Sequence, residues 1–497
     1  MVDKEKLNNR FIVNNISKKH ILVLNFGILI FICLISLLVV EIPIIFLWSI
    51  LVFSFIVFFS KELATSESFI IFYYFILVIS YFLVGYFGIY SFNQSPYVTI
   101  FYSRILVGMF HFLPFFIVFG LSIYSKHFRK ILLYKYFVIV LLLIYILVIN
   151  IFIHPNLDMS LIIQIRNFLA PFVAFLWGSY ASDKIRLDLF YKSLLFIALI
   201  ITFFGFFEYW LNYNFWLNFF PCYFVALIKK AGTLDNGLIG NKIIGMGNKV
   251  FFRMSSFFYE PKFAGYNFVF YFFFLIALIK ERLIRFSPKI LGAFCLLVLL
   301  LCIILTFIKS AWGVFGISIV ILSSLKLIGI KKIEKYKFIL TWVLLFLGVF
   351  GSIGLILVFL KLGISSTTIT HVRATLNIFN FSFKELLFGR KLENFNILNS
   401  DSGLATIIFS IGFVGYFIFT YGIVKILNNI LETDSFSFIK LVFFSLIIAW
   451  FAALHFKSDV WSPLGNFIIF FTAGVVSNLR MKSYHYAIYY YSHWNRS

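Results

Sequence analysis

The sequence predicts an all-α integral membrane protein with about 14 transmembrane helices. Of its 497 residues, 62% are hydrophobic and 12% are charged, and the mean hydropathy is +1.01. A soluble domain is about half apolar and about a quarter charged. Apolar runs of roughly 20 residues, the length a helix needs to cross a bilayer, follow one another along the chain. These features exclude a soluble enzyme, a secreted disulfide scaffold and a disordered chain.

The predicted spans are read as apolar runs of membrane-crossing length. They cover 21–40, 42–59, 69–90, 104–124, 134–153, 161–181, 189–211, 263–280, 290–308, 310–327, 338–360, 403–424, 436–454 and 463–479. The stretch 290–327 is too long for one helix in a bilayer, so we expect a break there, with Lys309 and Ser310 marking a tight hairpin between two spans. The run 21–40 has a long apolar core and no small-residue cleavage site after it, so we expect a retained anchor rather than a signal peptide.

The charge distribution follows the pattern of a membrane protein. Lysine and arginine number 42 against 19 acidic residues, which gives a formal net charge of +23. In a soluble protein this excess would suggest nucleic acid. Here most of the basic residues fall in short loops on one side, as the positive-inside rule requires. We therefore expect membrane lipid around the chain, no nucleic-acid partner, and both termini in the cytoplasm.

Two long segments on the other, outer side interrupt this pattern, at 212–262 and 361–402, within a single integral-membrane domain over 1–497. Long loops in compact membrane proteins are usually functional or disordered. The first segment contains Gly245-x-Gly247, which is too weak a signal for phosphate binding and is interpreted as a flexible loop. The sequence has no Walker-type phosphate loop, H-E-x-x-H or D-x-D motif. We therefore expect neither ATP, a metal nor another cofactor.

Basic side chains gather on the outer side, at or just above the predicted membrane surface. They are Arg166, Arg253, Lys262, Lys309, Arg373 and Arg390. Arginine is unfavourable near lipid, and its planar fork binds phosphate oxygens in pairs. This distribution favours an anionic substrate at the outer interface, such as a lipid-linked pyrophosphate. The alternative is that these cations reach lipid headgroups or pair with Glu260 and Glu385.

A hydroxyl acceptor would need a general base near these arginines. The candidates are His371, Asp401 and Glu260, with His455 and Asp459 less favoured. Each has a simpler interpretation. His371 is also typical of a solvated loop histidine, and Asp401 could cap the helix of span 403–424. Glu260 could merely neutralise Arg253.

Four segments carry a resemblance, which rests on their order and on their outer placement. They are Arg253-Met-Ser-Ser-Phe-Phe-Tyr-Glu260-Pro261; Leu305-Thr306-Phe-Ile-Lys309-Ser310-Ala-Trp-Gly313; His371-Val-Arg373 with Leu387-Phe388-Gly389; and Asn399-Ser-Asp401-Ser-Gly403-Leu with Gly412-Phe-Val-Gly415. In these segments the chain resembles the O-antigen polymerase and ligase superfamily of polytopic glycosyltransferases.

Two spacings and one substitution show where the chain follows the family pattern and where it departs from it. Arg373 and Gly389 have the Arg-x15-Gly spacing described for polymerases. Arg253 and Gly265 only approach the companion Arg-x10-Gly spacing, with eleven residues between them. Lys309-Ser310 replaces the Ser-Arg of the family.

The resemblance implies a fold like that of C-type glycosyltransferases, in the cytoplasmic (inner) membrane of a bacterium. The implied reaction joins O-antigen or capsule repeat units: the growing glycan leaves undecaprenyl pyrophosphate for the terminal sugar hydroxyl of another lipid-linked repeat. A chain-length regulator would be a further partner. Arg373 and Arg253 would hold the pyrophosphate, and His371 or Asp401 would activate the acceptor. Further substrate contacts would come from Arg166, Glu260, Lys262, Lys309 and Arg390.

Two other functions stay open. Ligases of the superfamily place a catalytic histidine just before the span equivalent to 403–424. Asp401 stands there in this chain, which favours a polymerase, although His371 keeps the ligase as an alternative. A flippase for lipid-linked oligosaccharides can also have about fourteen spans, but it should show two similar halves, and this sequence shows no such repeat.

Overall fold

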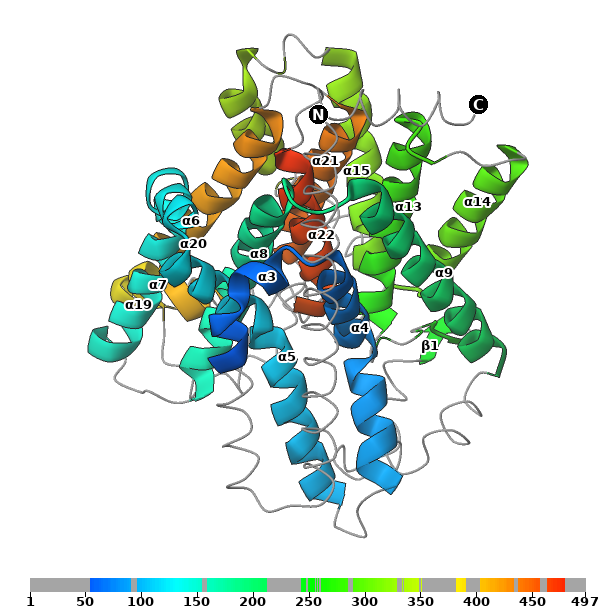
Figure 1. Cartoon of the computed structure of the whole chain (residues 1–497), viewed down its shortest axis with the longest axis horizontal. Coiled ribbons are helices and arrows are strands. Elements are labelled where there is room, and N and C mark those ends of the chain that lie inside the picture. The colour runs from blue at the N-terminus through cyan, green and yellow to red at the C-terminus, as the bar shows by residue number, and fades with distance from the viewer. Residues whose placement is uncertain are drawn as a thin grey trace, which may run out of the picture. The chain divides into compact units, whose positions relative to one another are not determined.

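The computed structural model describes most of the predicted helical regions. The described residues are 54–90, 96–153, 159–211, 243–246, 249–254, 256, 258, 261–284, 289–328, 333, 335–347, 350, 381–389, 403–432, 437–455 and 463–478. The predicted spans 21–40 and most of 42–59 lie outside them, as do most of the two outer segments. What is described is almost entirely helical, as the sequence predicts (Figure 1).

Residue contacts divide the chain into two compact units, and the prediction of a single domain stays a prediction. The first unit contains α3 (Ser60–Ala64), α4 (Glu67–Tyr90), α5 (Pro96–Tyr124) and the first part of α9 (Leu187–Leu211). The short helix α6 (Lys126–Lys130) lies at the boundary between the units in the sequence. The second unit contains the rest of α9 and the elements η1 (Ile131–Lys135), α7 (Phe137–Val148), η2 (Ile149–Ile153), α8 (Met159–Ala181), β1 (Ile243–Met246), β2 (Lys249–Phe252), α13 (Pro261–Lys280), α14 (Lys289–Leu305), α15 (Lys309–Ile328), α19 (Phe383–Phe388), α20 (Gly403–Leu431), α21 (Phe438–Leu454) and α22 (Pro463–Ser477).

Close helix contacts hold the first unit together. The Tyr73 hydroxyl on α4 donates a hydrogen bond to the Phe110 carbonyl on α5, with 3.0 Å between the oxygens. A Cβ added at Gly120 of α5 would lie 2.6 Å from the hydroxyl of Ser60, so a small residue lets α5 approach α3 this closely. Past the end of α5, Arg129 donates to the carbonyls of the last turn, which a helix leaves without partners.

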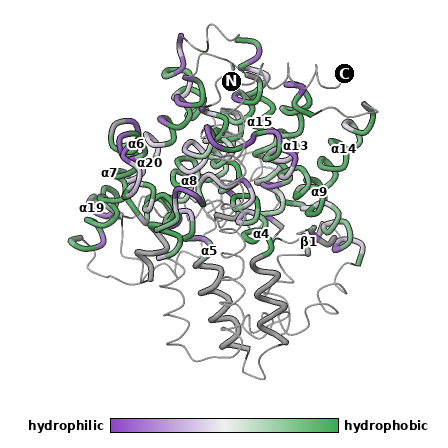
Figure 2. Tube along the Cα trace, in the orientation of Figure 1, coloured by the Kyte–Doolittle hydropathy of each residue, from purple (hydrophilic) through white to green (hydrophobic). Residues whose placement is uncertain are grey.

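Several helices have the length and composition of membrane spans. Among the described residues four qualify, namely Leu187–Leu211, Lys262–Lys280, Lys309–Ile328 and Thr406–Leu431, and the bent pair Lys126–Leu133 with Phe137–Phe152 would make a fifth. Shorter apolar helices also fall within predicted spans, and Figure 2 shows hydrophobic residues along most of the coloured helices. The apolar helices support a membrane protein, while the number of fourteen spans stays a prediction.

Exposed apolar residues form stripes on α9 and α14. On α9 they are Phe196, Leu199, Phe203, Phe207 and Trp210, and on α14 they are Ile290, Phe294, Leu297, Leu301 and Ile304. The spacing of three or four residues places each set on one helix face. Faces of this kind are suited to contact with lipid acyl chains.

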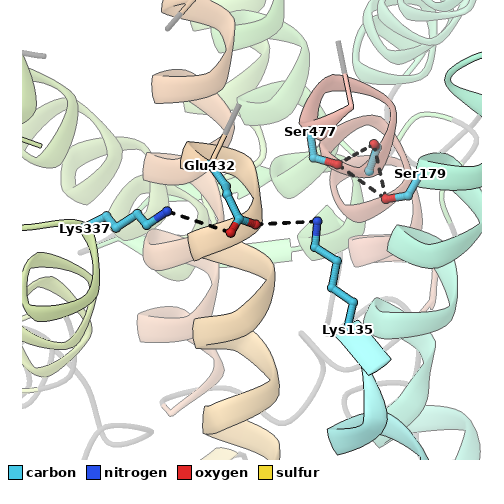
Figure 3. Close-up of polar contacts among 6 residues, drawn as sticks. Lys135, Ser179, Lys337, Glu432 and Ser477 are labelled. Atoms are coloured by element: carbon cyan, nitrogen blue, oxygen red, sulfur yellow. Dashed lines mark hydrogen bonds and ion pairs between the residues drawn. The ribbon is translucent and has the colours of Figure 1, made fainter. Parts of the chain in front are cut away.

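Helices α8, α21 and α22 form the interior of the second unit. Every residue of α21 from Ile439 to Leu454 is buried. Helices α8 and α22 touch through their backbones: a Cβ added at Gly178 or Gly474 would lie 2.0 or 2.2 Å from a carbonyl oxygen of the other helix. The hydroxyls of Ser179 and Ser477 meet in the same interface at 3.4 Å (Figure 3). Small residues allow this approach in the absence of a hydrophobic driving force between membrane helices.

A carboxylate joins two lysines in the second unit. Glu432, just after α20, lies 3.5 Å from Lys135 and 4.0 Å from Lys337 (Figure 3). All three side chains are at least one third exposed, so each ion pair contributes at most about 1 kcal/mol. The cluster shows that the ends of η1, α20 and the helix Lys337–Leu347 meet.

The structure confirms the expected break within 290–327. Helix α14 ends at Leu305 and α15 begins at Lys309. Between them, Phe307 has φ +49°, a left-handed conformation that stops the helix.

The flexible-loop interpretation of Gly245-x-Gly247 is wrong for the strand residues, and the hairpin they form is a departure from the all-α prediction. Strands β1 and β2 are antiparallel, with Ile243 opposite Phe252 and Met246 opposite Lys249. Only Gly247 and Asn248 separate them in the sequence, and a two-residue Gly-Asn connection is a known hairpin signal. The β-branched and aromatic residues around the glycines favour strands.

Candidate functional site

Arg253 directly follows strand β2, and its side chain is half-buried. Burial lowers the pKa of its guanidinium, because desolvation disfavours the charged form. Arginine nevertheless remains charged at any physiological pH. The hairpin therefore leads into a segment that carries a fixed positive charge into a partly desolvated position.

Two contacts attach the Arg253 segment to neighbouring helices. The backbone N–H of Met254 donates to the carbonyl of Leu305, the last residue of α14, at 3.0 Å. Met254 is fully buried against α9, where a Cβ added at Gly205 would lie 3.0 Å from its sulfur. Arg253 is thus placed beside the connection between α14 and α15.

Lys309 begins α15 at that same connection, between the two predicted spans. Its side chain is exposed over much of its length. Partial burial of its ammonium group, and then the positive charge of Arg253, lower its pKa. A like charge has this effect only at short range. Arg253 and Lys309, two of the cations that the sequence singled out, therefore both lie at the connection between α14 and α15.

The start of α13 packs against the start of α15. A Cβ added at Gly265 would lie 2.8 Å from the Cβ of Ala311. At the next residue, the Tyr266 hydroxyl donates to the Ser310 hydroxyl at 2.7 Å. Lys262 lies in the first turn of α13, three residues before Gly265, and its side chain is half-buried. We call Arg253, Lys262 and Lys309 the basic cluster.

Glu208 is a residue of this site that the sequence interpretation missed. It lies near the end of α9 and is fully buried. Its carboxylate accepts a hydrogen bond from the backbone N–H of Ser256 at 2.5 Å. The signal was available: a carboxylate inside a predicted span is a candidate functional residue by default.

The third and fourth resemblance segments meet in the second unit. Helix α20 is broken at Gly412, which has φ +62°. A Cβ at Gly412 would lie 2.2 Å from the carbonyl oxygen of Leu387 in α19, and one at Gly389 would lie 2.8 Å from that of Phe409. The Tyr145 hydroxyl on α7 donates to the carbonyl of Ile411, next to the break, at 2.8 Å. The contact anchors the end of α19, after which the chain continues to Arg390.

His455 lies at the end of α21 and against the beginning of α20. Its carbonyl accepts the backbone N–H of Leu404 at 2.9 Å. Its Nδ1 lies 2.7 Å from the Phe451 carbonyl, which can only accept, so Nδ1 carries the proton. Its Nε2 therefore accepts from the Tyr416 hydroxyl at 2.8 Å. The ring is held in one tautomer as an acceptor.

The remaining predicted site residues fall into two groups. Arg166 on α8 is half-buried, and its Nε and Nη2 each donate to the side-chain oxygen of Asn167 at 3.0 Å. The others lie outside the described residues: Glu260, His371, Arg373, Arg390 and Asp401.

The chemistry open to the basic cluster is the binding of an anion. Its three cations come from separate elements that meet at the connection between α14 and α15, and the Tyr266 and Ser310 hydroxyls lie beside it. Within the described part of the chain, no group of three or more His, Cys, Asp or Glu side chains is placed to hold a metal ion. No protein-family model, curated protein or solved structure matches this chain.

Proposed function

We propose that the chain is a surface-polysaccharide polymerase that works on the outer face of a bacterial cytoplasmic membrane. It would transfer a growing O-antigen or capsule glycan from undecaprenyl pyrophosphate to the terminal sugar hydroxyl of a second lipid-linked repeat. A ligase and a flippase are the alternatives.

One observation carries the proposal: two cations that repel each other are held together at the end of apolar helices. Lys309 feels the charge of Arg253, and the segment bearing Arg253 is tied by Met254 to the residue that ends α14. Like charges in a partly desolvated place repel each other, and an anion bound between them would relieve that repulsion. A pyrophosphate has the charge and the several acceptor oxygens to do so.

The reaction matches such a site. The acceptor hydroxyl oxygen forms a bond to the anomeric carbon of the donor glycan, and the bond from that carbon to the pyrophosphate oxygen breaks. The electron pair stays on the leaving pyrophosphate, where Arg253, Lys309 and, in this proposal, Arg373 stabilise the growing charge. The acceptor proton passes to a base, for which His371 and Asp401 remain the candidates. The donor already carries its leaving group, so neither nucleotide nor metal enters the scheme.

The four resemblance segments give a second line of support. The first two meet through Met254 and Leu305, and the last two meet through Gly389 and Gly412. Segments far apart in the sequence therefore form two contacts, and each contact lies next to an arginine of the proposal. Arg253 precedes the first contact directly, and Arg390 follows the second.

A direct test uses purified protein in lipid nanodiscs with a synthetic undecaprenyl-pyrophosphate-linked repeat. We expect a ladder of polymer without nucleotide or divalent metal. Lys309→Gln should lose the ladder, whereas Lys326→Gln, a matched change in the last turn of the same helix, should retain it. Absence of a ladder from the wild-type protein on its native repeat would overturn the polymerase.

A ligase is the second candidate, because one observation favours it. His455 binds the first turn of α20 through its carbonyl, so a histidine lies beside the region in which ligases place their catalytic one. Deletion of the gene separates the alternatives. Cells without a polymerase still display a single repeat unit on the surface. Cells without a ligase accumulate lipid-linked polymer, and cells without a flippase display no glycan.

A further inference from the structure

Glu208 presents a physical problem that the proposed reaction does not explain. It is the only acidic residue between Leu189 and Leu211, a stretch that is otherwise apolar or aromatic apart from Lys192, Ser193 and Thr202. Its side chain is fully buried. Removing a carboxylate from water is strongly unfavourable unless it receives hydrogen bonds or a charge partner. A hydrogen-bond partner of this carboxylate is therefore informative.

That partner is the segment that begins with Arg253. Ser256 donates its backbone N–H to the Glu208 carboxylate and its hydroxyl to the carbonyl of Ile201, both at 2.5 Å. Both acceptors lie on α9, seven residues apart and hence two turns along one face. The segment is thus attached to α9 at two levels through a single residue.

Ser256 has a backbone conformation that is unfavourable for a residue other than glycine. Its φ is +53°, in the left-handed region that non-glycine residues seldom adopt. Such a conformation persists when the surroundings determine it, and its backbone N–H bond to Glu208 is part of those surroundings. The turn at Ser256 lies three residues after Arg253, so it determines how the chain leaves the basic cluster.

We propose that Glu208 is a positioning residue for the basic cluster: it fixes the turn at Ser256 and thereby holds Arg253 beside Lys309. This inference rests on the proposed function only for the identity of the ligand, a lipid pyrophosphate. Glu208 acts through the segment and does not touch the substrate.

Binding of undecaprenyl pyrophosphate to the full-length protein in nanodiscs tests the inference. Glu208→Ala should weaken binding at least about tenfold, the loss expected for a hydrogen bond to a charged group. Glu208→Gln should stay within about threefold of wild type, because its amide oxygen can still accept the Ser256 N–H. Glu208→Asp keeps the charge but is one methylene too short, and we expect it to resemble Glu208→Ala.

Hydrogen exchange supplies a readout that general destabilisation would not move. The Ser256 amide should exchange faster in Glu208→Ala and Glu208→Asp than in wild type or Glu208→Gln. The control is Leu142→Ala, which truncates a buried side chain on α7, a different helix from the one that carries Glu208. It should lower thermal stability yet leave Ser256 exchange and ligand binding unchanged.

The outcomes separate the two ideas. If wild type does not bind undecaprenyl pyrophosphate, the proposed function fails, while the exchange result still decides whether Glu208 fixes the turn. If wild type binds and Glu208→Asp binds equally well with a protected Ser256 amide, the positioning role is wrong.

Discussion

Tyr266 on α13 donates its hydroxyl proton to the hydroxyl of Ser310 on α15, with 2.7 Å between the oxygens. The bond joins the N-terminal parts of the two helices, and the two residues lie 44 positions apart in the sequence. Ser310 directly follows Lys309, so the bond also fixes the end of α15 that presents a cation of the basic cluster. Removing this hydrogen bond should show how much the start of α15 depends on it.

Tyr266→Phe should lower stability by about 1 kcal/mol, since it removes one hydrogen bond and little volume. The measurement is the thermal unfolding midpoint of the detergent-purified protein. Ser310→Ala should cost a similar amount, and the double variant should cost no more than the larger single effect. Additive losses would show that the two hydroxyls act independently.

The contact between Gly412 and α19 makes a stronger prediction. Alanine at Gly412 would combine a left-handed φ with a Cβ 2.2 Å from the Leu387 carbonyl oxygen. Strain and overpacking together should cost roughly 3 kcal/mol or more, so Gly412→Ala should express poorly or unfold at a markedly lower temperature.

Gly316 on α15 is the matched control, because a Cβ there would meet no atom within 4 Å. Gly316→Ala should be neutral or should stabilise the protein by up to about 1 kcal/mol, as alanine favours helix over glycine. Equal effects of the two alanines would mean that α19 does not pack at Gly412 as described.

The sequence predicted what hydropathy and charge determine directly. Helix positions and the break before Lys309 follow from the fixed length of an apolar span. The break in α20 could not be predicted, because Gly412 lies inside an uninterrupted apolar run and its conformation depends on α19, more than twenty residues earlier in the sequence. The β-hairpin does not follow from Gly245 and Gly247 alone, because it depends on the β-branched and aromatic residues beside them.

In the candidate site, too, some residues could be predicted from charge alone, and others depend on packing. Basic residues on the predicted outer side identified Arg253 and Lys309, and the structure places both at the connection between α14 and α15. Partners inside the helices could not be identified in the same way. Glu208 and the accepting role of His455 depend on which backbone groups face them, and that is decided by packing between distant segments.

The orientation of the chain can be tested with reporter fusions. The positive-inside rule predicts that the hairpin loop at Gly247 lies outside and that Glu432 lies in the cytoplasm. Alkaline phosphatase fused after Asn248 should be active, whereas a fusion after Glu432 should be inactive. Green fluorescent protein should give the reverse pattern. Activity in the reverse order would remove the outer location on which the proposed function depends.

Lys309 should give ligand binding a dependence on pH. Its pKa is lowered, so in the empty site the ammonium loses its proton at a lower pH than an ordinary lysine. A pyrophosphate favours the protonated form, and affinity should therefore fall as pH rises toward the ordinary lysine value of 10.5. Measurements should begin at about pH 8, above the last ionisation of a phosphate ester.

Two lysine-to-arginine variants provide the comparison. Lys309→Arg should bind with an affinity that is nearly independent of pH over this range, because arginine keeps its proton. Lys326→Arg, in the last turn of α15, should retain the wild-type profile. A wild-type affinity that is constant up to pH 10.5 would contradict the placement of Lys309 at the ligand.

Arg373→Lys tests the residue with the closest match to the polymerase spacing. The variant retains a positive charge but loses the planar fork that can bind two phosphate oxygens at once. We expect polymer length to collapse while the protein still inserts and reaches wild-type amounts in the membrane, measured by glycan gel electrophoresis and immunoblotting. Lys384→Arg, a nearby change in the same predicted outer segment, should leave the ladder intact. A normal ladder from Arg373→Lys would mean that bidentate binding at this position is not required, and the pyrophosphate would then have to be held by the basic cluster alone.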